Sequence, residues 1–578
     1  MTSTRCASRI FALLLGAALL VQAAAAQTAP SPANKPERLE WFRDQGFGLF
    51  IHWSLDSQLG SVISHSMAGA SSDYLNRFVN ELPASFNPRK FNPADWAALA
   101  KLAGIRYVVF TTKHHSGFTM FDSKTTDFSI MKTPFRRDIT RELLDAFRAQ
   151  GIAPGMYFSP DDFWWLHRNG KQINRNVPAV FPANNPGLMQ HDLAQVRELL
   201  TGYGPIDVMF FDGPPEGLRE LAWQLQPNLV VTRGAIETPE QYVPGVPLDE
   251  AWEACITMGT QWQYKPTNDV YKTGGQLISL LIETRAKGGN LLLNIGPKPD
   301  GELPIEQEER LREIALWMFL NGEAIHAVRP WVITNEGDYW FTKKRKEAAA
   351  DAPFQQVRAS TTAPNVTVAP ATQDAEGETL YVIVKPKERW KYGQWKDITL
   401  RSVKSTPNTT ASVLSQNDEV LEYQPGVVPK TTWKQDAKGL HIRAMRAQRI
   451  YNDRKWPNPV VIKLTNVQPA LTPPRVESTG ARWNAAPRTA TLTGNIAALG
   501  DAASVQAGFE YRDTTGMDLT ERMGPWLATA LVRRTATGAY TVTTPALQPG
   551  RTYEFRAVVK HPLLTIYGEE KQFRTAAR

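Results

Sequence analysis

The sequence predicts an α/β protein: a (β/α)₈-like barrel catalytic domain followed by two β-sandwiches. Three observations predict this class. From about Pro36 to Trp331, apolar strand-like runs alternate with helical runs; after Trp331 the helical periodicity stops; and a Pro-rich hinge, Pro469–Pro474, opens a last segment. Near-continuous apolar strands between helices indicate a parallel sheet buried on both faces. The length of this alternation suits a barrel, with a doubly wound open sheet as the alternative.

These changes in composition and periodicity divide the chain into four predicted segments. Residues 1–26 are a signal peptide, and residues 27–331 form the catalytic barrel domain. Residues 332–467 form a β-sandwich, and residues 468–578 form a second β-sandwich.

The N-terminal segment has the pattern of a secretory signal. Arg5 and Arg9 precede an apolar run from Ile10 to Val21, and small residues follow up to Ala26. Such a leader is removed on export, and the run is shorter than the roughly 20 apolar residues of a membrane anchor. We expect cleavage after Ala26, no membrane anchor afterwards, and a periplasmic or secreted protein of bacterial source.

Cleavage leaves a weakly basic chain with one cysteine. It removes two arginines and no acid, so the net charge falls from +8 to +6, and it removes Cys6, so only Cys255 remains. A small net charge on a long chain is a weak signal for nucleic acid, and we expect no nucleic-acid partner. Without an internal disulfide, stability must come from packed cores, and Cys255 is expected to pack as a small buried side chain.

The barrel prediction depends on six strand-like runs with helical runs between them. The strands are predicted at Phe47–Trp53, Arg106–Thr112, Ile152–Ser159, Ile206–Asp212, Asn228–Thr232 and Asn290–Gly296. Helical runs cover Pro93–Ala103, Asp138–Gln150 and Met189–Thr201. No Gly-x-Gly-x-x-Gly follows the first strand, which counts against a dinucleotide fold.

The two C-terminal segments show the period-two pattern of strands. Thr379–Val384 alternates in the first of them, and Val505, Ala507, Phe509 and Tyr511 alternate in the second. Leu547–Tyr553 resembles the tyrosine corner of fibronectin type III domains. The last segment is therefore predicted to be a fibronectin type III-like β-sandwich, a fold that carries no functional information by itself.

Polar side chains gather where the predicted barrel strands end. They are His52, His114, His115, Tyr157, Asp212 and Arg233. Barrel enzymes place their active sites at this end of the strands. Burying so many polar groups together is costly unless they meet a polar ligand.

Five motifs in one order resemble the α-L-fucosidases of glycoside hydrolase family 29. They are Gly48–Trp53, Thr112–Phe118, Phe211–Gly213, Trp252–Cys255 and Gly289–Pro297, and the resemblance runs from about Trp41 to Trp331. The sandwich behind the barrel is also similar to the family's second domain. The resemblance implies a retaining exo-α-L-fucosidase that releases terminal α-L-fucose from fucosylated oligosaccharides or glycoconjugates, with no metal and no organic cofactor.

The resemblance also implies residue roles. Asp212 matches the nucleophile, and Glu253, in the Trp-Glu motif, matches the acid/base. The residues that match fucose contacts or supports of the nucleophile are His52, His114, His115, Tyr157 and Arg233. Two positions depart from the family pattern: Phe210 stands where a substrate-contacting Trp is common, and Ser72–Tyr74 replaces a Glu-Trp-Tyr stretch, which removes a carboxylate expected to bind a hydroxyl.

Elementary chemistry supports two carboxyl roles. Cleavage with retention takes two carboxyl groups about 5–5.5 Å apart, one a nucleophile and one an acid. Arg233 and the nearby histidines would keep Asp212 ionised. The acid needs a raised pKa, which suits Glu253 beside Trp252; Glu237 is the rival, because loop conformation decides which carboxylate faces the sugar.

Two other classes of function stay open at this point. In one, the chain is a metal-dependent hydrolase with His52, His114, His115 and Asp212 as ligands; adjacent histidines on a strand point different ways, which weakens this class. In the other, the barrel is inactive and the β domains bind glycans. The turn Pro297–Gly301, with Asn294 before it, is interpreted as structural. Linkage preference, aglycone and oligomeric state are not predicted.

Overall fold

The computed structural model has the predicted fold class, a barrel followed by β-sandwiches. It describes residues 33–248, 250–345, 377–385, 388–419, 424, 426–448, 458–515, 526–561 and 565–576. The predicted signal peptide, residues 1–26, lies outside the described residues. Within the described ranges, no helix combines the length and the apolar character needed to cross a membrane.

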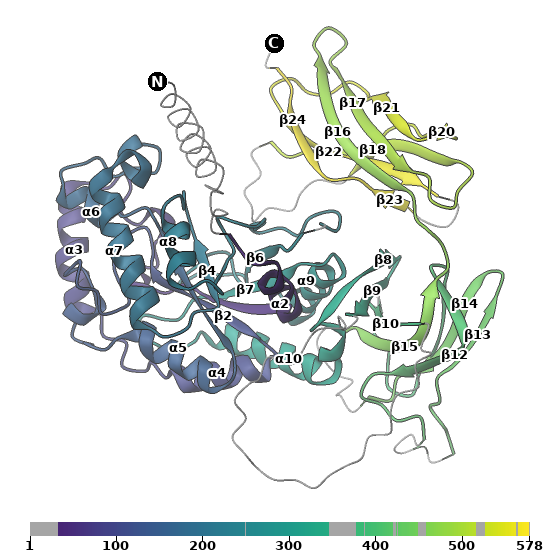
Figure 1. Ribbon diagram of the computed structural model, residues 1–578, viewed down its shortest axis with the longest axis horizontal. Helices are drawn as coiled ribbons and strands as arrows, with labels where there is room; N and C mark the ends of the chain where they lie inside the picture. Colours follow the sequence, from purple (N-terminus) through teal and green to yellow (C-terminus); the bar gives the residue numbers. More distant parts are fainter. Residues whose placement is uncertain are drawn as a thin grey trace, which may run out of the picture.

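The N-terminal half is a curled parallel sheet with helices packed around it (Figure 1). Its strands lie in the order β5-β4-β3-β2-β1-β7-β6. Their bounds are β1 Phe47–Ile51, β2 Tyr107–Lys113, β3 Ala153–Phe158, β4 Val208–Phe211, β5 Val230–Val231, β6 Glu253–Thr257 and β7 Asn290–Ile295. Nearly all of these residues are buried, which is why the strands read as continuous apolar runs.

Strand β6 is the one barrel strand that the sequence did not predict. It begins with a charged residue, Glu253, and lacks a long apolar run. Five parallel pairs with β7, from Glu253–Asn290 to Thr257–Asn294, hold it in the sheet. Its strand conformation follows from its neighbours more than from its own composition.

The barrel closes between β5 and β6 through an irregular segment, residues 237–241, which we call the closing segment. Glu237 and Glu240 form isolated parallel bridges with Trp252 and Cys255. The backbone N–H of Cys255 also donates to a carbonyl oxygen of the segment at 3.0 Å. The closing segment therefore occupies the sixth of eight positions around the barrel, and it brings two glutamates there.

Helices cover the outside of the sheet (Figure 1). Their bounds are α2 Pro36–Gln45, α3 Ser72–Ser85, α4 Pro93–Leu102, α5 Ile139–Ala149, α6 Phe163–Arg168, α7 Pro186–Gly202, α8 Leu218–Leu225, α9 Gly274–Ala286 and α10 Ile305–Asn321. Asn92, Asp138 and Asn185 cap the starts of α4, α5 and α7 by accepting backbone N–H bonds. Helix α7 starts earlier than predicted because Asn185–Pro186 supplies both a cap and a first-turn proline.

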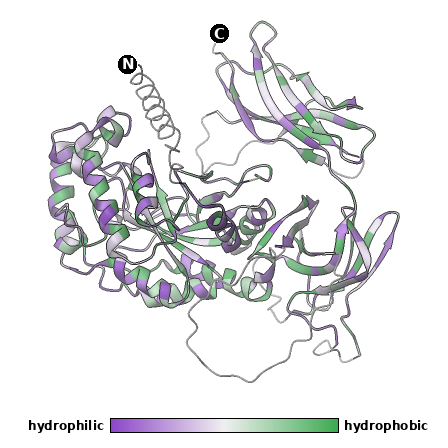
Figure 2. Cartoon of the chain, viewed as in Figure 1, coloured by the Kyte–Doolittle hydropathy of each residue, from purple (hydrophilic) through white to green (hydrophobic). Residues whose placement is uncertain are grey.

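Apolar and aromatic side chains fill the barrel interior beneath the polar rim. This cluster comprises Phe42, Phe50, Tyr107, Val109, Tyr157, Val208, Phe210, Val230, Cys255 and Leu292. Alternate residues of a strand point to the same face, so β4 directs Val208 and Phe210 inward and then continues to Asp212. Figure 2 shows the matching hydrophobic colouring along the barrel strands. The interior is thus a packed floor for the site above it.

The second folded unit consists of two antiparallel sheets, in the strand orders β12-β15-β10-β9-β8 and β11-β14-β13. The strands are β8 Val328–Glu336, β9 Tyr339–Lys344, β10 Glu378–Val384, β11 Trp395–Leu400, β12 Val403–Val413, β13 Thr432–Asp436, β14 Gly439–Met445 and β15 Val460–Pro469. Phe341, Val382, Ile398, Leu440 and Ile462 lie in the core that these strands share.

The third unit also has two antiparallel sheets. Its strands are β16 Arg475–Asn484, β17 Thr489–Ala498, β18 Val505–Asp513, β19 Leu527–Ala528, β20 Val532–Arg534, β21 Gly538–Thr543, β22 Thr552–Lys560, β23 Thr565–Tyr567 and β24 Lys571–Arg574. The hydroxyl oxygen of Tyr553 accepts a hydrogen bond from the backbone N–H of Gln548 at 3.1 Å. This is the tyrosine corner that the sequence predicts.

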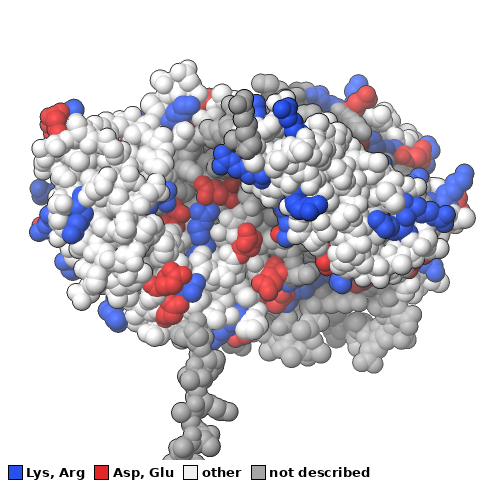
Figure 3. All heavy atoms as spheres, turned by 90° about the horizontal axis from the view of Figure 1, so that it is seen from above, with Lys and Arg blue, Asp and Glu red and all other residues white. Residues whose placement is uncertain are grey.

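The third unit packs against both others. Ile566 contacts the core of the second unit as well as its own. Glu570 lies against Gly245 of the loop between the closing segment and β6, where an added Cβ would be 2.5 Å from its Oε1. Seen from above, the molecule is hollowed near its centre, with acidic and basic side chains together in the hollow (Figure 3).

Candidate active site

The structure brings six predicted polar side chains to the C-terminal ends of the barrel strands. They are His52 after β1, His114 and His115 after β2, Tyr157 near the end of β3, Asp212 after β4 and Arg233 after β5. His52 and His114 have ring centroids 5.6 Å apart, and His114 stacks on Tyr157 at 4.9 Å with an interplanar angle of 10°. These contacts join residues from three strands, β1, β2 and β3.

Asp212 is the carboxylate at the centre of this site. The Tyr157 hydroxyl donates to its Oδ2 at 2.7 Å, and Arg233 Nη1 donates to its Oδ1 at 3.1 Å. His115 Nε2 lies 3.5 Å from Oδ2. The Asp212 side chain is still 21% exposed, so its carboxylate remains accessible to a ligand while its neighbours fix its orientation.

The pKa of Asp212 is lowered despite its enclosed position. Burial alone would raise this pKa, but the hydrogen bond from His115 and the nearby Arg233 hold it well below its usual range. The carboxylate is therefore ionised at neutral pH, as a nucleophile must be.

His52 and His114 are neutral and present opposite hydrogen-bonding groups. Burial lowers the pKa of both rings, that of His52 to about 3. His52 Nδ1 donates to Asn294 Oδ1 at 2.6 Å, because the Asn294 amide NH₂ already donates to Trp262 O. His114 Nδ1 accepts the backbone N–H of His115 at 2.9 Å. His52 therefore offers an acceptor at Nε2 and His114 a donor at Nε2, a pairing that suits sugar hydroxyls.

The same hydrogen bonds test the alternative of a catalytic metal. Potential ligand atoms of His114, His115 and Asp212 lie within 4.8 Å of one another. Because His114 Nδ1 accepts a backbone N–H, its Nε2 carries the proton and has no lone pair for an ion. His52, the fourth residue of this alternative, does not belong to the group. Two ligands of the group then remain, whereas a catalytic zinc site takes three protein ligands. The donor set does not fit such a metal.

Phe210 supports the site from below. Its ring stacks under Tyr157 at 5.6 Å with an interplanar angle of 18°, and the Arg233 guanidinium lies 4.8 Å from its centroid. The side chain is 1% exposed. Phe210 was predicted to bind substrate, but its position instead fits a support for Tyr157 and Arg233.

The structure does not bring Glu253 to this rim. Glu253 is the first residue of β6 and pairs with Asn290, the first residue of β7, so it lies at the N-terminal end of the barrel. The Tyr107 hydroxyl donates to its Oε2 at 2.5 Å, and the side chain is fully buried. Burial raises its pKa to about 7. The raised pKa that the sequence reasoning required is present, but the side chain has no surface that a substrate contacts.

A different glutamate lies beside the nucleophile candidate. Arg233 Nη1, which contacts Asp212 Oδ1, also contacts Glu240 Oε2 at 3.0 Å. Since both oxygens touch one nitrogen, they are at most about 6 Å apart, close to the roughly 5–5.5 Å of retaining glycosidases. Glu237, the rival considered from the sequence, is exposed on the same closing segment.

Sequence reasoning passed over three other residues of the site. Asn294 orients His52, and its signal was a polar residue inside the apolar run of β7. Asp161 Oδ2 lies 3.7 Å from His115 Nδ1 and 3.4 Å from Arg175 Nε. No motif marks Asp161 or Arg175, because the loop that brings them to His115 has no periodic pattern.

A barrel with an ionised carboxylate, a second carboxylate nearby and neutral hydroxyl-binding groups at its C-terminal rim has the arrangement of a glycoside hydrolase. Comparison with known proteins narrows this class. The sequence profile described as Alpha-L-fucosidase matches residues 16–323. The chain belongs to this family and is an enzyme, an alpha-L-fucosidase.

Individual relatives agree with the family match. The plasma alpha-L-fucosidase of Homo sapiens is 30% identical over 362 residues, which cover 54% of this chain and 75% of that protein. A putative alpha-L-fucosidase of Caenorhabditis elegans is 29% identical over 429 residues, covering 66% of this chain and 83% of the relative.

Solved structures show the same fold. Alpha-L-fucosidase isoenzyme 1 from Paenibacillus thiaminolyticus superposes with a TM-score of 0.56 at 27% identity, over 74% of this chain and 98% of that one. A GH29 alpha-L-fucosidase from Bacteroides thetaiotaomicron gives a TM-score of 0.54 at 22% identity, over 76% and 97% of the two chains. The latter likeness concerns the fold alone.

Proposed function

We propose that the enzyme is a retaining exo-glycosidase that releases terminal α-L-fucose from fucosylated oligosaccharides or glycoconjugates, with Asp212 as nucleophile and Glu240 as acid/base. One observation carries this proposal: Arg233 Nη1 contacts the carboxylates of both residues, at 3.1 and 3.0 Å. Retention requires such a pair. Family membership sets aside the alternative of a non-catalytic glycan-binding protein.

In the first step, Asp212 attacks the anomeric carbon while Glu240 gives its proton to the departing glycosidic oxygen. The C–O bond to the aglycone breaks as the bond to Asp212 forms. In the second step, Glu240 takes a proton from water, which attacks the same carbon and releases Asp212 and fucose. Two inversions give net retention.

The remaining rim residues bind the sugar and hold the nucleophile. His52 Nε2 and the His114 Nε2–H are the acceptor and donor available to fucose hydroxyls. Tyr157 and Arg233 each hold one oxygen of Asp212, which fixes the carboxylate before substrate arrives. Because these contacts exist before substrate binds, Asp212 is preorganised and needs little reorientation during the reaction.

The role of Glu253 as acid/base remains a prediction that its burial makes less favourable. Three single variants, Glu240→Ala, Glu253→Ala and Glu237→Ala, decide which of these glutamates is the acid/base. Loss of the acid/base should slow natural fucosides by about 10²–10⁴-fold. A nitrophenyl fucoside, whose leaving group needs little protonation, should still form the fucosyl-enzyme. Added azide then attacks without a base and gives α-fucosyl azide.

We expect this retained azide only for Glu240→Ala. Glu237→Ala is the matched control, because it removes a carboxylate from the same closing segment. If Glu253→Ala alone gives the α-azide, the acid/base is Glu253 and the assignment of Glu240 is wrong.

We also propose that the enzyme is exported to the periplasm or the medium. Support comes from the leader with Arg5, Arg9 and the apolar run that follows. N-terminal sequencing of the secreted protein should find Gln27 as the first residue; an N-terminus at Met1 would contradict export with cleavage.

A further inference from the structure

We propose that the cleft between the three folded units binds an acidic segment of the glycan, one that carries sulfate or carboxylate groups. The cleft has a volume of about 1710 Å³, and residues 245–248, strand β8 and parts of β16 and β23 line it. This volume exceeds the roughly 300–1,000 Å³ of an ordinary small-ligand pocket, so several sugar rings fit. The inference rests on the proposed function in one respect, that the ligand is part of a glycan.

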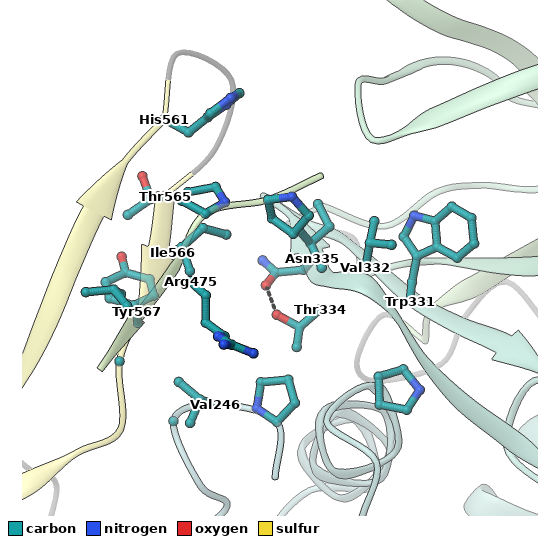
Figure 4. A pocket seen from close by; sticks show the side chains of 18 of the residues that line it. Val246, Trp331, Val332, Thr334, Asn335, Arg475, His561, Thr565, Ile566 and Tyr567 are labelled. Atoms are coloured by element: carbon teal, nitrogen blue, oxygen red, sulfur yellow. Dashed lines mark hydrogen bonds between the residues drawn. The ribbon is translucent and has the colours of Figure 1, made fainter. Parts of the chain in front are cut away.

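Three cationic side chains of the cleft have no acidic partner within the described ranges. They are Arg401, Arg475 and Lys560, and all three are exposed. Figure 4 shows Arg475 extending from β16 into the space between Thr334 of β8 and Val246 of the barrel loop. A guanidinium in this position can bind a sulfate or carboxylate through two parallel hydrogen bonds.

The acidic side chains of the cleft are, by contrast, already engaged. Both carboxylate oxygens of Glu336 accept backbone N–H bonds, of 2.7 to 3.0 Å. Glu477 accepts a hydrogen bond from Asn495 at 3.1 Å, and Glu569 lies 3.7 Å from Lys571 Nζ. These bonds to neutral donors leave Glu336 and Glu477 charged, while Glu569 pairs with Lys571 and Arg43 pairs with Glu40. Three cations then stand against two carboxylates among the lining residues, a small positive excess that attracts anions.

The neutral lining favours a carbohydrate as the carrier of that negative charge. Thr334, Asn335 and Thr565 present hydroxyl and amide groups, and Tyr339 and Tyr567 add aromatic rings. Sugars combine hydroxyls, which pair with such polar groups, and apolar ring faces, which stack on aromatic side chains. The lining thus matches a sugar chain along its length and an anionic substituent at Arg475.

The cleft also has a structural link to the active site. The loop that forms part of its wall, at Val246, follows directly from the closing segment that carries Glu240. Glu570 of the third unit packs on Gly245 of this loop. A glycan held in the cleft therefore contacts the same loop that the catalytic carboxylate depends on, which makes the third unit part of substrate recognition.

Calorimetric titration of the full-length protein tests the proposal without any turnover. The ligands are tetrasaccharides that lack fucose: oligogalacturonate for carboxylate, a sulfated galactan for sulfate, and chitotetraose as the neutral probe. We expect one or both anionic probes to bind and the neutral probe to bind at least about fivefold more weakly, a difference of about 1 kcal/mol. Raising the salt concentration should weaken the anionic binding.

Variants assign the binding to this cleft. Arg475→Ala should raise the dissociation constant of the anionic probe at least about fivefold. Arg482→Ala is the matched control, because Arg482 is an exposed arginine of the same strand β16 outside the cleft. Neither variant should change kcat/KM for a nitrophenyl fucoside, since no cleft residue touches the reacting atoms.

Several results would overturn the inference. It fails if neither anionic probe binds, if chitotetraose binds as tightly, or if Arg482→Ala weakens binding as much as Arg475→Ala. Equal binding of oligothymidylate with the same dependence on Arg475 would make the cleft a general polyanion site instead. An inactive enzyme that still binds the acidic probes through Arg475 would contradict the proposed function and leave the cleft assignment standing.

Discussion

Asp212 and Glu253 are two enclosed carboxylates of one barrel, and their pKa values move in opposite directions. Asp212, at the C-terminal rim, has His115, Arg233 and a tyrosine hydroxyl around it, and its pKa is well below the usual range. Glu253, at the N-terminal end, is fully buried beside Tyr107, and burial raises its pKa to about 7. Both carboxylates accept a hydrogen bond from a tyrosine, so the tyrosine cannot account for the contrast.

The contrast shows that neighbouring hydrogen bonds and charges, and not burial alone, set the pKa of an enclosed carboxyl in this barrel. At the rim, the His115 hydrogen bond and the charge of Arg233 together outweigh the cost of burial. At the opposite end, the Tyr107 hydrogen bond and Arg233 lower the Glu253 pKa too little to offset that cost. The protein thus keeps one carboxyl charged for chemistry and holds another, with a raised pKa, within its packing.

The largest expected effect comes from removing Asp212, the charged carboxylate of the two. Asp212→Gly should lower kcat at least about 10³-fold, because the covalent intermediate can no longer form. Added azide should partly restore turnover by attacking from the vacated side and give β-fucosyl azide, identified by NMR. Near-normal turnover, or an α-azide product, would contradict the nucleophile assignment.

Because its pKa is raised on folding, Glu253 should make the stability of the protein depend on pH. The pKa of Glu253 rises from an ordinary 4.5 to about 7 on folding, so between these values the folded protein retains a proton that the unfolded chain has lost. The stability that this proton contributes is complete below about pH 4.5 and is lost as pH rises towards 7. Chemical denaturation of wild type and Glu253→Gln should differ by a free energy that changes by about 3 kcal/mol over this window. A constant difference would mean that Glu253 is ionised in the fold.

A matched pair of variants probes the two tyrosines. Tyr107→Phe removes the donor to Glu253 and should lower the free energy of unfolding by about 1–3 kcal/mol with little change in kcat. Tyr157→Phe makes the same chemical change at Asp212 and should lower kcat by about tenfold or more. Equal effects of the two variants on kcat would remove the distinction between the two ends of the barrel.

The smallest expected effect is that of a chelator. Because the His114 hydrogen bond leaves this ring no lone pair for an ion, activity should be unchanged after dialysis against EDTA. Loss of activity on chelation and its return with zinc would instead support the metal-dependent hydrolase.

Much of the fold was predictable because apolar strands and capped helices are local signals. The positions of Asp212 and Arg233 also followed, since they end strands of a parallel sheet, whose C-terminal ends meet at one rim. The identity of the second carboxylate did not follow. Glu237, Glu240 and Glu253 lie close together in sequence, and only the bridges of the closing segment to β6 determine which of them meets Arg233.

At Glu253, the local sequence pattern and the strand register point to different roles. It stands beside Trp252 in a family motif and has the raised pKa expected of an acid. One pairing, Glu253 with Asn290 at the start of β7, places it at the wrong end of the barrel for that role. Strand register is a long-range property, because it depends on residues far away in the chain.

Arg233 links the closure of the barrel to the geometry of its two rim carboxylates. Within the described ranges, no ladder joins β5 to the closing segment; Arg233 instead donates to Thr238 through Nε at 3.2 Å and Nη2 at 3.3 Å. The guanidinium that holds both carboxylates therefore also substitutes for backbone pairing between β5 and the closing segment. Lysine has no planar fork and cannot make both sets of contacts. We therefore expect Arg233→Lys to lower the melting temperature and kcat together.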